Sequence, residues 1–157
     1  MILITGGHGQ LGTELRHLLD EKKLEYVSTD ADQLDITDKE ATYKFITDMK
    51  PEIIYHCAAY TAVDKAEDEG KELDEKINVE GTRNVAEAAK AAGSTLIYIS
   101  TDYVFDGKKK DGMYQVDDTT NPLSEYGRTK LLGEKAVQET MDNYYIIRTS
   151  WVFGIYG

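Results

Sequence analysis

The feature that most constrains this chain is a glycine-rich turn between an apolar run and a helical pattern at the N-terminus. Residues 2–4 are Ile-Leu-Ile, glycines follow at positions 6, 9 and 12, and leucines recur at roughly helical spacing from Leu11 to Leu19. In such a turn one glycine permits a tight bend, one lets the backbone approach a pyrophosphate, and one lets the helix pack on the strand. At a strand–helix junction the pattern therefore favours dinucleotide binding over a simple tight connection.

Short apolar runs alternate with helical patterns along the rest of the chain. The apolar runs predict strands at residues 25–29, 34–36, 53–57, 96–99 and 144–148, the one at 34–36 very short. The helical patterns predict helices over about residues 39–49, 72–92 and 124–141, and the polar stretch 107–121 predicts a surface loop. Alternation of this kind with apolar strands indicates an α/β fold, a doubly wound Rossmann-type parallel sheet with helices on both faces.

The composition limits the classes of partner. The 157 residues suffice for one domain, predicted to span residues 1–157, and 29 acidic against 18 basic residues give a net charge of −11. This balance argues against a nucleic-acid partner. No apolar run approaches the roughly 20 residues of a membrane-spanning helix, so no membrane partner is expected. The acidic concentration at residues 64–80 is interpreted as a solvated helix face.

The cysteine and histidine content gives two further expectations. The single cysteine, Cys57, excludes an internal disulfide and favours a reducing compartment, so we expect a cytoplasmic protein. The three histidines, His8, His17 and His56, fall on different predicted elements, so we expect no metal site.

Asp30 ends the predicted strand 25–29 and follows Gly12 at about the distance typical of an acidic residue that binds the adenosine ribose. A carboxylate there favours NADH slightly over NADPH, because a 2′-phosphate would meet a negative charge. The alternative is an ordinary surface aspartate in a turn, and a neighbouring Lys or Arg can compensate the charge, so both cofactors stay open.

A candidate catalytic group combines Tyr126 and Lys130 with the end of the strand 96–99. Tyr126 and Lys130 stand four residues apart near a helix start and therefore share a face. An ammonium group near a phenol stabilises the phenolate, so we expect Lys130 to lower the pKa of Tyr126 and make it an effective general acid. Thr101 and Asp102 follow the strand at the carboxyl edge of the sheet, where open parallel sheets bind ligands.

With the N-terminal turn, these segments resemble the short-chain dehydrogenase/reductase family, specifically its extended branch that modifies sugar nucleotides. The resemblance covers essentially the whole chain. It also includes the sequence CAAYT at residues 57–61, Asn78 within INVEGT, and RTSWVFG at residues 148–154.

The resemblance implies a role for each matching position. The residues expected to bind NADH or NADPH are Gly6, His8, Gly9, Gln10, Leu11, Gly12, Asp30, Asp35, Ile36, Ala58, Ala59, Tyr60, Tyr126 and Lys130. The expected catalytic residues are Thr101, Tyr126 and Lys130, with Asn78 in a proton-relay role or as a structural brace. The residues expected to contact the substrate are Thr61, Val63, Thr101, Asp102, Tyr103 and Trp151. For Trp151, packing at the sheet edge is an equal alternative.

Within the branch, the runs STDYVFDG, AAYTAVD and RTSWVFG are most similar to those of dTDP-4-dehydrorhamnose reductases. Related 4,6-dehydratases carry Asp-Glu directly after the strand-end threonine, whereas this chain has Asp102-Tyr103 and lacks that glutamate. The resemblance implies reduction of the 4-keto group of a dTDP-linked sugar in dTDP-L-rhamnose biosynthesis, and a possible homodimer.

Members of that family run well past 157 residues and carry a C-terminal substrate lobe. We therefore expect a fragment without that lobe, which binds NAD(P)H and has little or no reductase activity by itself. The regulatory subunit of methionine adenosyltransferase resembles the same reductases, so a non-catalytic NAD(P)-binding role is an alternative. Another nucleotide-sugar reductase or an epimerase is the alternative among enzymes.

Overall fold

The computed structural model describes residues 1–156; the last residue of the predicted domain, Gly157, lies outside them. Its sheet has five parallel strands in the order β2-β1-β3-β4-β5. The strands are β1 (Ile2–Thr5), β2 (Tyr26–Thr29), β3 (Ile53–His56), β4 (Thr95–Thr101) and β5 (Tyr144–Thr149). The doubly wound parallel sheet predicted from the alternating pattern is confirmed.

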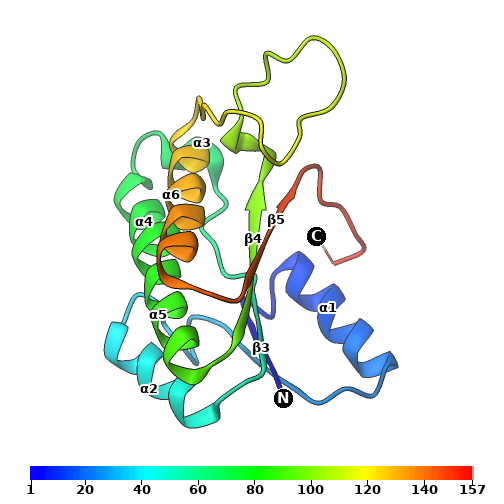
Figure 1. Cartoon of the computed structure of the whole chain (residues 1–157), viewed down its shortest axis with the longest axis vertical. Coiled ribbons are helices and arrows are strands. Elements are labelled where there is room, and N and C mark those ends of the chain that lie inside the picture. The colour runs from blue at the N-terminus through cyan, green and yellow to red at the C-terminus, as the bar shows by residue number, and fades with distance from the viewer. Residues whose placement is uncertain (157) are drawn as a thin grey trace.

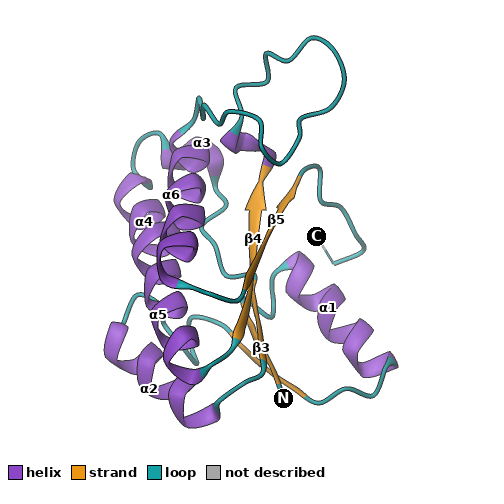
Figure 2. Cartoon of the chain, viewed as in Figure 1, coloured by secondary structure: helices purple, strands orange, loops and turns teal. Residues whose placement is uncertain are grey.

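Helices cover both faces of the sheet. Figure 1 shows α1 (Gln10–Glu21) on one side and α2 (Lys39–Met49), α5 (Thr82–Ala92) and α6 (Glu125–Thr140) on the other. Between β3 and α5 the chain forms α3 (Val63–Ala66), α4 (Lys71–Glu75) and the π-helical segment η1 (Lys76–Gly81). A short 3₁₀ turn, η2 (Asp102–Val104), follows β4, and the predicted loop 107–121 has no helix or strand (Figure 2).

The core lies between the sheet and the helices on its α5 face. Leu3, Ile54 and Leu96, from three adjacent strands, cluster with Val85 and Ala89 of α5, and none of the five is exposed to solvent. Burial of each large aliphatic side chain contributes about 1.5–3 kcal/mol. The core therefore fixes the central strands, and with them the loops that leave their carboxyl ends.

The strand predicted at residues 34–36 is wrong. Asp35 accepts hydrogen bonds at Oδ1 from the Thr37 backbone at 2.9 Å and hydroxyl at 2.8 Å, while the Leu34 amide donates to the Asp30 carbonyl at 2.8 Å. These bonds form a turn, as aspartate commonly does with the backbone two residues on. Leu34 and Ile36 are nevertheless buried, so their apolar character reflects core contact and not strand pairing.

The helix predicted over residues 72–92 is present but irregular, because α4, η1 and α5 follow one another without a break. Gly93 ends α5 in the left-handed region, with φ of 74°. The acidic stretch 64–80 is not wholly a solvated face, since Asp74 is fully buried. That correction matters because Asp74 faces the helix that carries Tyr126, as described below.

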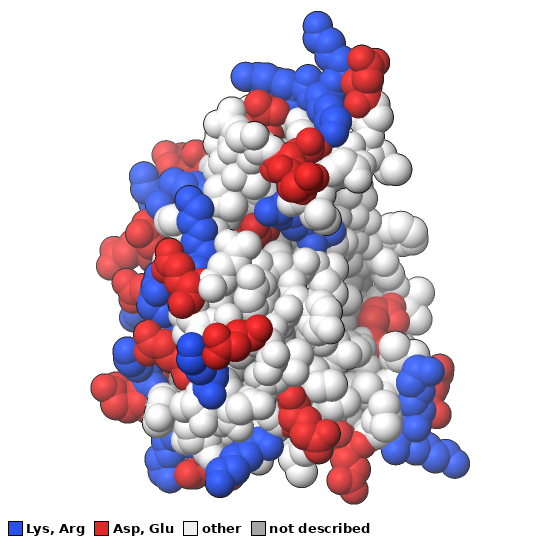
Figure 3. All heavy atoms as spheres, in the orientation of Figure 1, with Lys and Arg blue, Asp and Glu red and all other residues white. Residues whose placement is uncertain are grey.

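The chain order of the strands places a cleft at one edge of the sheet. β1 pairs with β2 on one side and with β3 on the other. The loops that follow β1 and β3 therefore separate at the carboxyl end of β1. Ligands bind at such a switch point, outside the carboxyl ends of the strands. None of the helices formed by residues 1–156 is long and apolar enough to cross a membrane. Figure 3 shows charged side chains of both signs over the helical side, and a largely uncharged central area.

Candidate active site

The turn after β1 can be built only with glycine at two of its positions. Gly6 has φ of 73°, and a Cβ there would lie 2.6 Å from the backbone nitrogen of Ala58 in the loop after β3. A Cβ on Gly12 would overlap the carbonyl oxygen of Gly6. The turn is therefore packed tightly against both the next loop and the first turn of α1.

The N-terminus of α1 is free to bind an anion. Its N-cap is Gly9, no side chain caps it, and its first turn holds no acidic residue. The first amides of a helix lack partners within the helix, and the helix dipole favours negative charge there. This end of α1 therefore has the features of a phosphate site.

Asp30 follows β2 at the same edge of the sheet. Its carboxylate accepts from the His8 backbone amide at 3.1 Å and lies 2.9 Å from His8 Nδ1. The carboxylate expected to bind the adenosine ribose is thus bonded to the glycine-rich turn.

A cavity of about 900 Å³ runs along this edge of the sheet. Most predicted site residues line it, namely Gly6, Gly9, Gln10, Leu11, Gly12, Asp30, Asp35, Ile36, Ala58, Ala59, Thr61, Val63, Thr101, Asp102, Tyr103, Tyr126, Lys130 and Trp151. Three others do not line it: His8, Tyr60 and Asn78. The Tyr60 hydroxyl lies against Gly70, away from the expected nicotinamide position.

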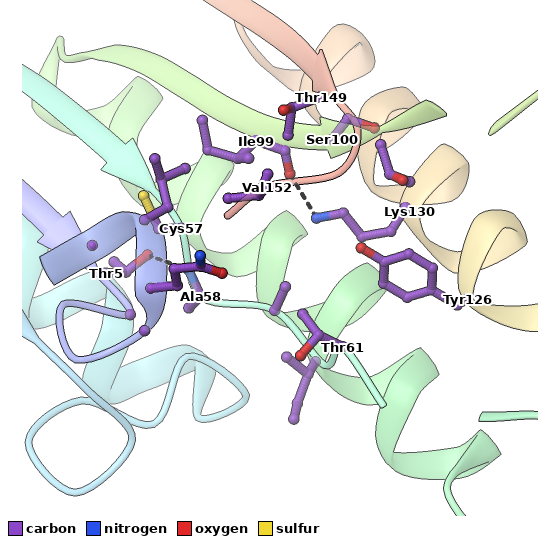
Figure 4. A pocket seen from close by; sticks show the side chains of 18 of the residues that line it. Thr5, Cys57, Ala58, Thr61, Ile99, Ser100, Tyr126, Lys130, Thr149 and Val152 are labelled. Carbon is purple, nitrogen blue, oxygen red and sulfur yellow. Dashed lines mark hydrogen bonds between the residues drawn. The ribbon is translucent and has the colours of Figure 1, made fainter. Parts of the chain in front are cut away.

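Tyr126 and Lys130 extend from α6 into this cavity. Figure 4 shows the Lys130 side chain directed at β4, with Tyr126 beside it. Lys130 Nζ donates to the Ile99 carbonyl oxygen at 2.7 Å and lies 4.3 Å from the centre of the Tyr98 ring. Thr101, at the end of β4, lines the same cavity as Tyr126 and Lys130. All three expected catalytic residues therefore line one cavity.

The expected effect of Lys130 on Tyr126 is not found. Burial raises the pKa of Tyr126, although its hydrogen bond with Thr101 opposes the change. Burial also lowers the pKa of Lys130 to about 7, against the attraction of Glu134. The Lys130 nitrogen lies on a backbone carbonyl and carries little charge above that pH, so it does not stabilise the phenolate. Tyr126 therefore keeps its proton at neutral pH.

Asn78 joins the loop after β3 to the helices beneath it. Its side-chain oxygen accepts from the Tyr60 amide at 2.9 Å, and its side-chain nitrogen donates to the Tyr60 carbonyl at 3.1 Å. The same nitrogen donates to Asp74 at 2.5 Å, and the Thr129 hydroxyl donates to Asp74 at 2.9 Å. Asp74, Asn78 and Thr129 are all buried. The network connects this loop to α6 next to Lys130. These contacts match the structural role expected for Asn78 as the alternative to a proton relay.

A second buried network connects α6 to strands β4 and β5 through Glu134. Glu134 accepts from Ser100 at 2.6 Å and forms a two-bond ion pair with Arg148 at 2.9 and 2.7 Å. Glu134 is 2% exposed and Arg148 20%. Arg148 also donates to the Val116 carbonyl at 3.2 Å, which connects the loop 107–121 to the sheet.

Sequence reasoning missed the supporting residues Asp74, Thr129 and Glu134. Asp74 precedes Asn78 by four residues and Glu134 follows Lys130 by four, so each shares a helix face with a predicted site residue. That spacing is the signal that could have found them. Cys57 also lines the cavity, and burial raises the pKa of its thiol to about 12, so it is an unreactive thiol here.

Metal ligands do not gather at this site. Within residues 1–156 no group of three or more His, Cys, Asp or Glu side chains is placed to hold a metal ion.

The doubly wound sheet, the glycine turn at its switch point and the Tyr126–Lys130 pair define a Rossmann domain of the short-chain dehydrogenase/reductase type. A UDP-glucose 4-epimerase from Thermus thermophilus shares this fold at a TM-score of 0.84 and 22% identity. The chain belongs to the family described as RmlD substrate binding domain, whose family model matches residues 1–157.

Named relatives agree with this assignment. The dTDP-4-dehydrorhamnose reductase of Aggregatibacter actinomycetemcomitans is 43% identical over 157 residues, covering 99% of this chain and 53% of the relative. A crystal structure of the dTDP-4-dehydrorhamnose reductase of Clostridium acetobutylicum matches at a TM-score of 0.94 with 47% identity, covering 98% of this chain and 54% of the other. The crystal structure of the Bacillus anthracis dTDP-4-dehydrorhamnose reductase in complex with NADP matches at a TM-score of 0.94 with 42% identity, covering 99% of this chain and 55% of the other. The chain thus spans about half the length of the relatives it matches.

Proposed function

We propose that this chain supplies the cofactor-binding and catalytic portion of an NAD(P)H-dependent reductase of dTDP-4-dehydro-L-rhamnose, acting in dTDP-L-rhamnose biosynthesis. The observation that carries the proposal is the shared cavity, which is lined by the glycine turn, by Asp30 and by the group Thr101, Tyr126 and Lys130. A phosphate-binding helix end and a proton-donating group in one cleft fit transfer of a hydride and a proton to a carbonyl. The relatives named dTDP-4-dehydrorhamnose reductase give the substrate class.

The cavity has the features that a nicotinamide dinucleotide requires. Gly9 leaves the backbone open where the pyrophosphate approaches, because its missing Cβ has only the Gly6 carbonyl oxygen nearby, at 3.4 Å. The uncapped α1 would hold the phosphates, and Asp30 the adenosine ribose. Ala58 and Ala59 would border the nicotinamide end. When bound, the reduced cofactor supplies the hydride.

Tyr126 is in the correct state to act as the proton donor in a reduction. Its raised pKa keeps the phenol protonated, and Thr101 lines the same cavity. A carbonyl oxygen held between these two hydroxyls would receive the proton of Tyr126 as the alcohol forms. Lys130, fixed on the Ile99 carbonyl, would position the neighbouring ribose.

The substrate is proposed to lie on the outer part of the cavity. Asp102 and Tyr103 of η2 line it together with Thr61 and Val63 of the opposite loop. Trp151 also lines the cavity and is 91% exposed, so its ring is free to stack on a sugar. Tyr103 packs edge-on against Tyr126, with ring centres 5.7 Å apart, which places this side of the site beside the proton donor.

A cytoplasmic location and a homodimer belong to the same proposal. The location is supported by the single cysteine of the sequence. Light scattering on the purified chain tests the dimer, since a mass of one chain contradicts it. We also propose that the 157 residues alone reduce a sugar nucleotide weakly or not at all, because the chain spans about half the length of the relatives named for that activity.

Titration of the chain with NADH and NADPH, followed by the fluorescence of the reduced nicotinamide, tests the cofactor function. Saturable binding of either cofactor is expected, and Gly9→Ala should weaken it. Absence of binding to a folded chain contradicts the proposal. Loss of reduced nicotinamide on addition of dTDP-4-dehydrorhamnose measures the reductase step. Because little or no activity is expected of the 157 residues alone, this step is measured in a protein that also carries a substrate lobe, where Tyr126→Phe should abolish the activity while cofactor binding persists. Unchanged turnover in Tyr126→Phe would remove this residue from the mechanism.

A further inference from the structure

A buried carboxylate lies beside the candidate active site without lining its cavity. Asp74 of α4 is fully buried and is not among the cavity residues. Its Oδ1 accepts from the Asn78 side-chain nitrogen at 2.5 Å and from the Thr129 hydroxyl at 2.9 Å, and burial raises its pKa against these two bonds. Its Oδ2 is buried and has no hydrogen-bond partner among residues 1–156. Because a buried acid with an unpaired oxygen costs stability, Asp74 is not explained as a stabilising residue.

The hydrogen bond with Asn78 fixes the loop after β3. An ionised carboxylate accepts but does not donate, so Asp74 takes the side-chain nitrogen of Asn78 as its neighbour. The side-chain oxygen of Asn78 is then left to accept from the Tyr60 amide at 2.9 Å, and the nitrogen also donates to the Tyr60 carbonyl at 3.1 Å. Both backbone groups of Tyr60 are therefore held, directly after Ala58 and Ala59, which line the cavity.

The hydrogen bond with Thr129 reaches the first turns of α6. The Thr129 hydroxyl also lies 3.0 Å from the Tyr126 carbonyl oxygen, and Lys130 is the next residue along the helix. Figure 4 shows Ala58 and Tyr126 on opposite sides of the cavity. Oδ1 of Asp74 is therefore one acceptor shared by two walls of the cavity, the loop after β3 and α6.

We propose that Asp74 is a positioning residue for the nicotinamide half of the cofactor, because through Asn78 and Thr129 it sets how the loop 58–60 lies against α6. The inference rests on the proposed cofactor function, in which that loop borders the nicotinamide and Lys130 positions its ribose. The adenosine half is assigned to the glycine-rich turn and the end of β2, to which Asp74 forms no hydrogen bond within residues 1–156. Asp74 should therefore affect the binding of one half of the cofactor and not of the other.

The test compares, by isothermal titration calorimetry, a reduced cofactor with the same molecule lacking nicotinamide. The pairs are NADH with ADP-ribose, and NADPH with 2′-phospho-ADP-ribose. Asp74→Ala removes the shared acceptor, so cofactor affinity should fall about fivefold or more, while affinity for the matched ligand changes by less than about twofold. Asp74→Asn keeps an oxygen that can accept both hydrogen bonds but removes the charge. The ratio of the two affinities in Asp74→Asn should therefore stay within about twofold of that of the unmodified chain.

A second pair of variants and a control accompany the test. Both substitutions of Asp74 should lower Tm, because each leaves buried polar groups less well paired, so Tm does not separate positioning from stability. Thr129→Val removes the hydroxyl and should shift the affinity ratio in the same direction as Asp74→Ala, whereas Thr129→Ser keeps the hydroxyl and should not. This pair decides the question if Asp74→Ala does not fold. Asp68→Ala, at an exposed aspartate between α3 and α4, should leave both affinities unchanged.

An unchanged affinity ratio in Asp74→Ala overturns the inference, and so does an equal change of the ratio in Asp74→Asn. Equal weakening of the cofactor and its matched ligand also overturns it, because Asp74 then only supports the fold. Where the Thr129 variants decide, equal ratios in the valine and serine variants overturn it. The proposed function fails differently, because the unmodified chain would then bind neither the cofactors nor the matched ligands, and the inference would fail with it.

Discussion

Replacing Gly12 by alanine inserts a methyl group into the tightest part of the glycine-rich turn. The new Cβ would overlap the Gly6 carbonyl oxygen and lie 2.9 Å from the Gly7 Cα and 3.0 Å from the Gly6 carbonyl carbon. All three neighbours are backbone atoms, so the clash cannot be relieved by rotation of a side chain. The start of α1 or the turn itself must move.

The cost of this substitution follows from overpacking. Insertion of a methyl group into a packed site costs about 1–3 kcal/mol. For a chain of this length, each 1 kcal/mol lowers Tm by roughly 2–4 °C. We therefore expect Gly12→Ala to lower Tm by about 2–12 °C in a thermal denaturation followed by circular dichroism. It should also weaken cofactor binding, because the displaced turn carries the phosphate-binding amides.

Gly9→Ala is the matched control, three residues away in the same turn. Gly9 has φ of −66° and ψ of 166°, and within residues 1–156 its missing Cβ has the Gly6 oxygen, at 3.4 Å, as its one neighbour inside 4 Å. Alanine fits this backbone, so the free energy of unfolding should change by less than about 1 kcal/mol. Its methyl group would occupy the pyrophosphate position, so cofactor affinity should fall at least about tenfold. Unchanged affinity in Gly9→Ala, or an unchanged Tm in Gly12→Ala, would refute this account of the turn.

Three further predictions concern α6 and its support. Glu134→Ala should lower the free energy of unfolding by about 3–5 kcal/mol in urea denaturation, because it leaves Arg148 unpaired. The control is Glu139→Ala, which removes an exposed partner of another ion pair and should cost at most about 1 kcal/mol. Equal losses in the two variants would contradict the argument. Lys130 has a folded-state pKa of about 7, against 10.5 for the free side chain. Between these pH values the unfolded chain binds more protons than the folded chain. The free energy of unfolding should therefore rise with pH from about 7 to 10.5, by at most about 1.4 kcal/mol per pH unit. Lys130→Met should remove that rise, and parallel pH profiles would disprove the burial of its charge. Asn78→Asp places a second carboxylate in the buried network, so its destabilisation should lessen as the pH falls and the pair takes up a proton, whereas Asn78→Ser should show no such pH dependence.

The glycine turn and the strand pattern were predictable because they depend on local requirements. Gly6 and Gly12 meet backbone atoms of the adjacent loop and of the same turn, whereas Gly7 faces the Ser28 side chain of β2. The helix beginning at residue 39 was predictable from Asp38, whose side chain accepts from the Ala41 amide at 3.0 Å. The Asp38 signal survives in a single sequence because the amide that its side chain accepts from is only three positions away.

The segment 34–36 was mispredicted because its apolar residues are compatible with a half-buried strand and also with a turn that places them in the core. Leu34 and Ile36 alternate with Asp35 as in a half-buried strand, yet they reach the core from a turn. Alternation reports which side chains are buried, not whether a neighbouring strand is available for pairing. Here the Asp35 carboxylate accepts from the Thr37 backbone amide and hydroxyl, so the segment forms a turn and does not extend the sheet.

The electrostatics of the candidate catalytic group were not predictable from the spacing of Tyr126 and Lys130. Four residues on a helix do bring both side chains into one cavity. The spacing does not show that Lys130 turns to the Ile99 carbonyl and the Tyr98 ring, nor that burial outweighs its attraction to Glu134. Both shifts arise from desolvation, which depends on residues distant in sequence. The same burial that denies Tyr126 an ammonium neighbour keeps its proton in place, and a protonated phenol is what reduction of a carbonyl requires. Burial therefore keeps Tyr126 as a phenol, the form that carries a proton to donate.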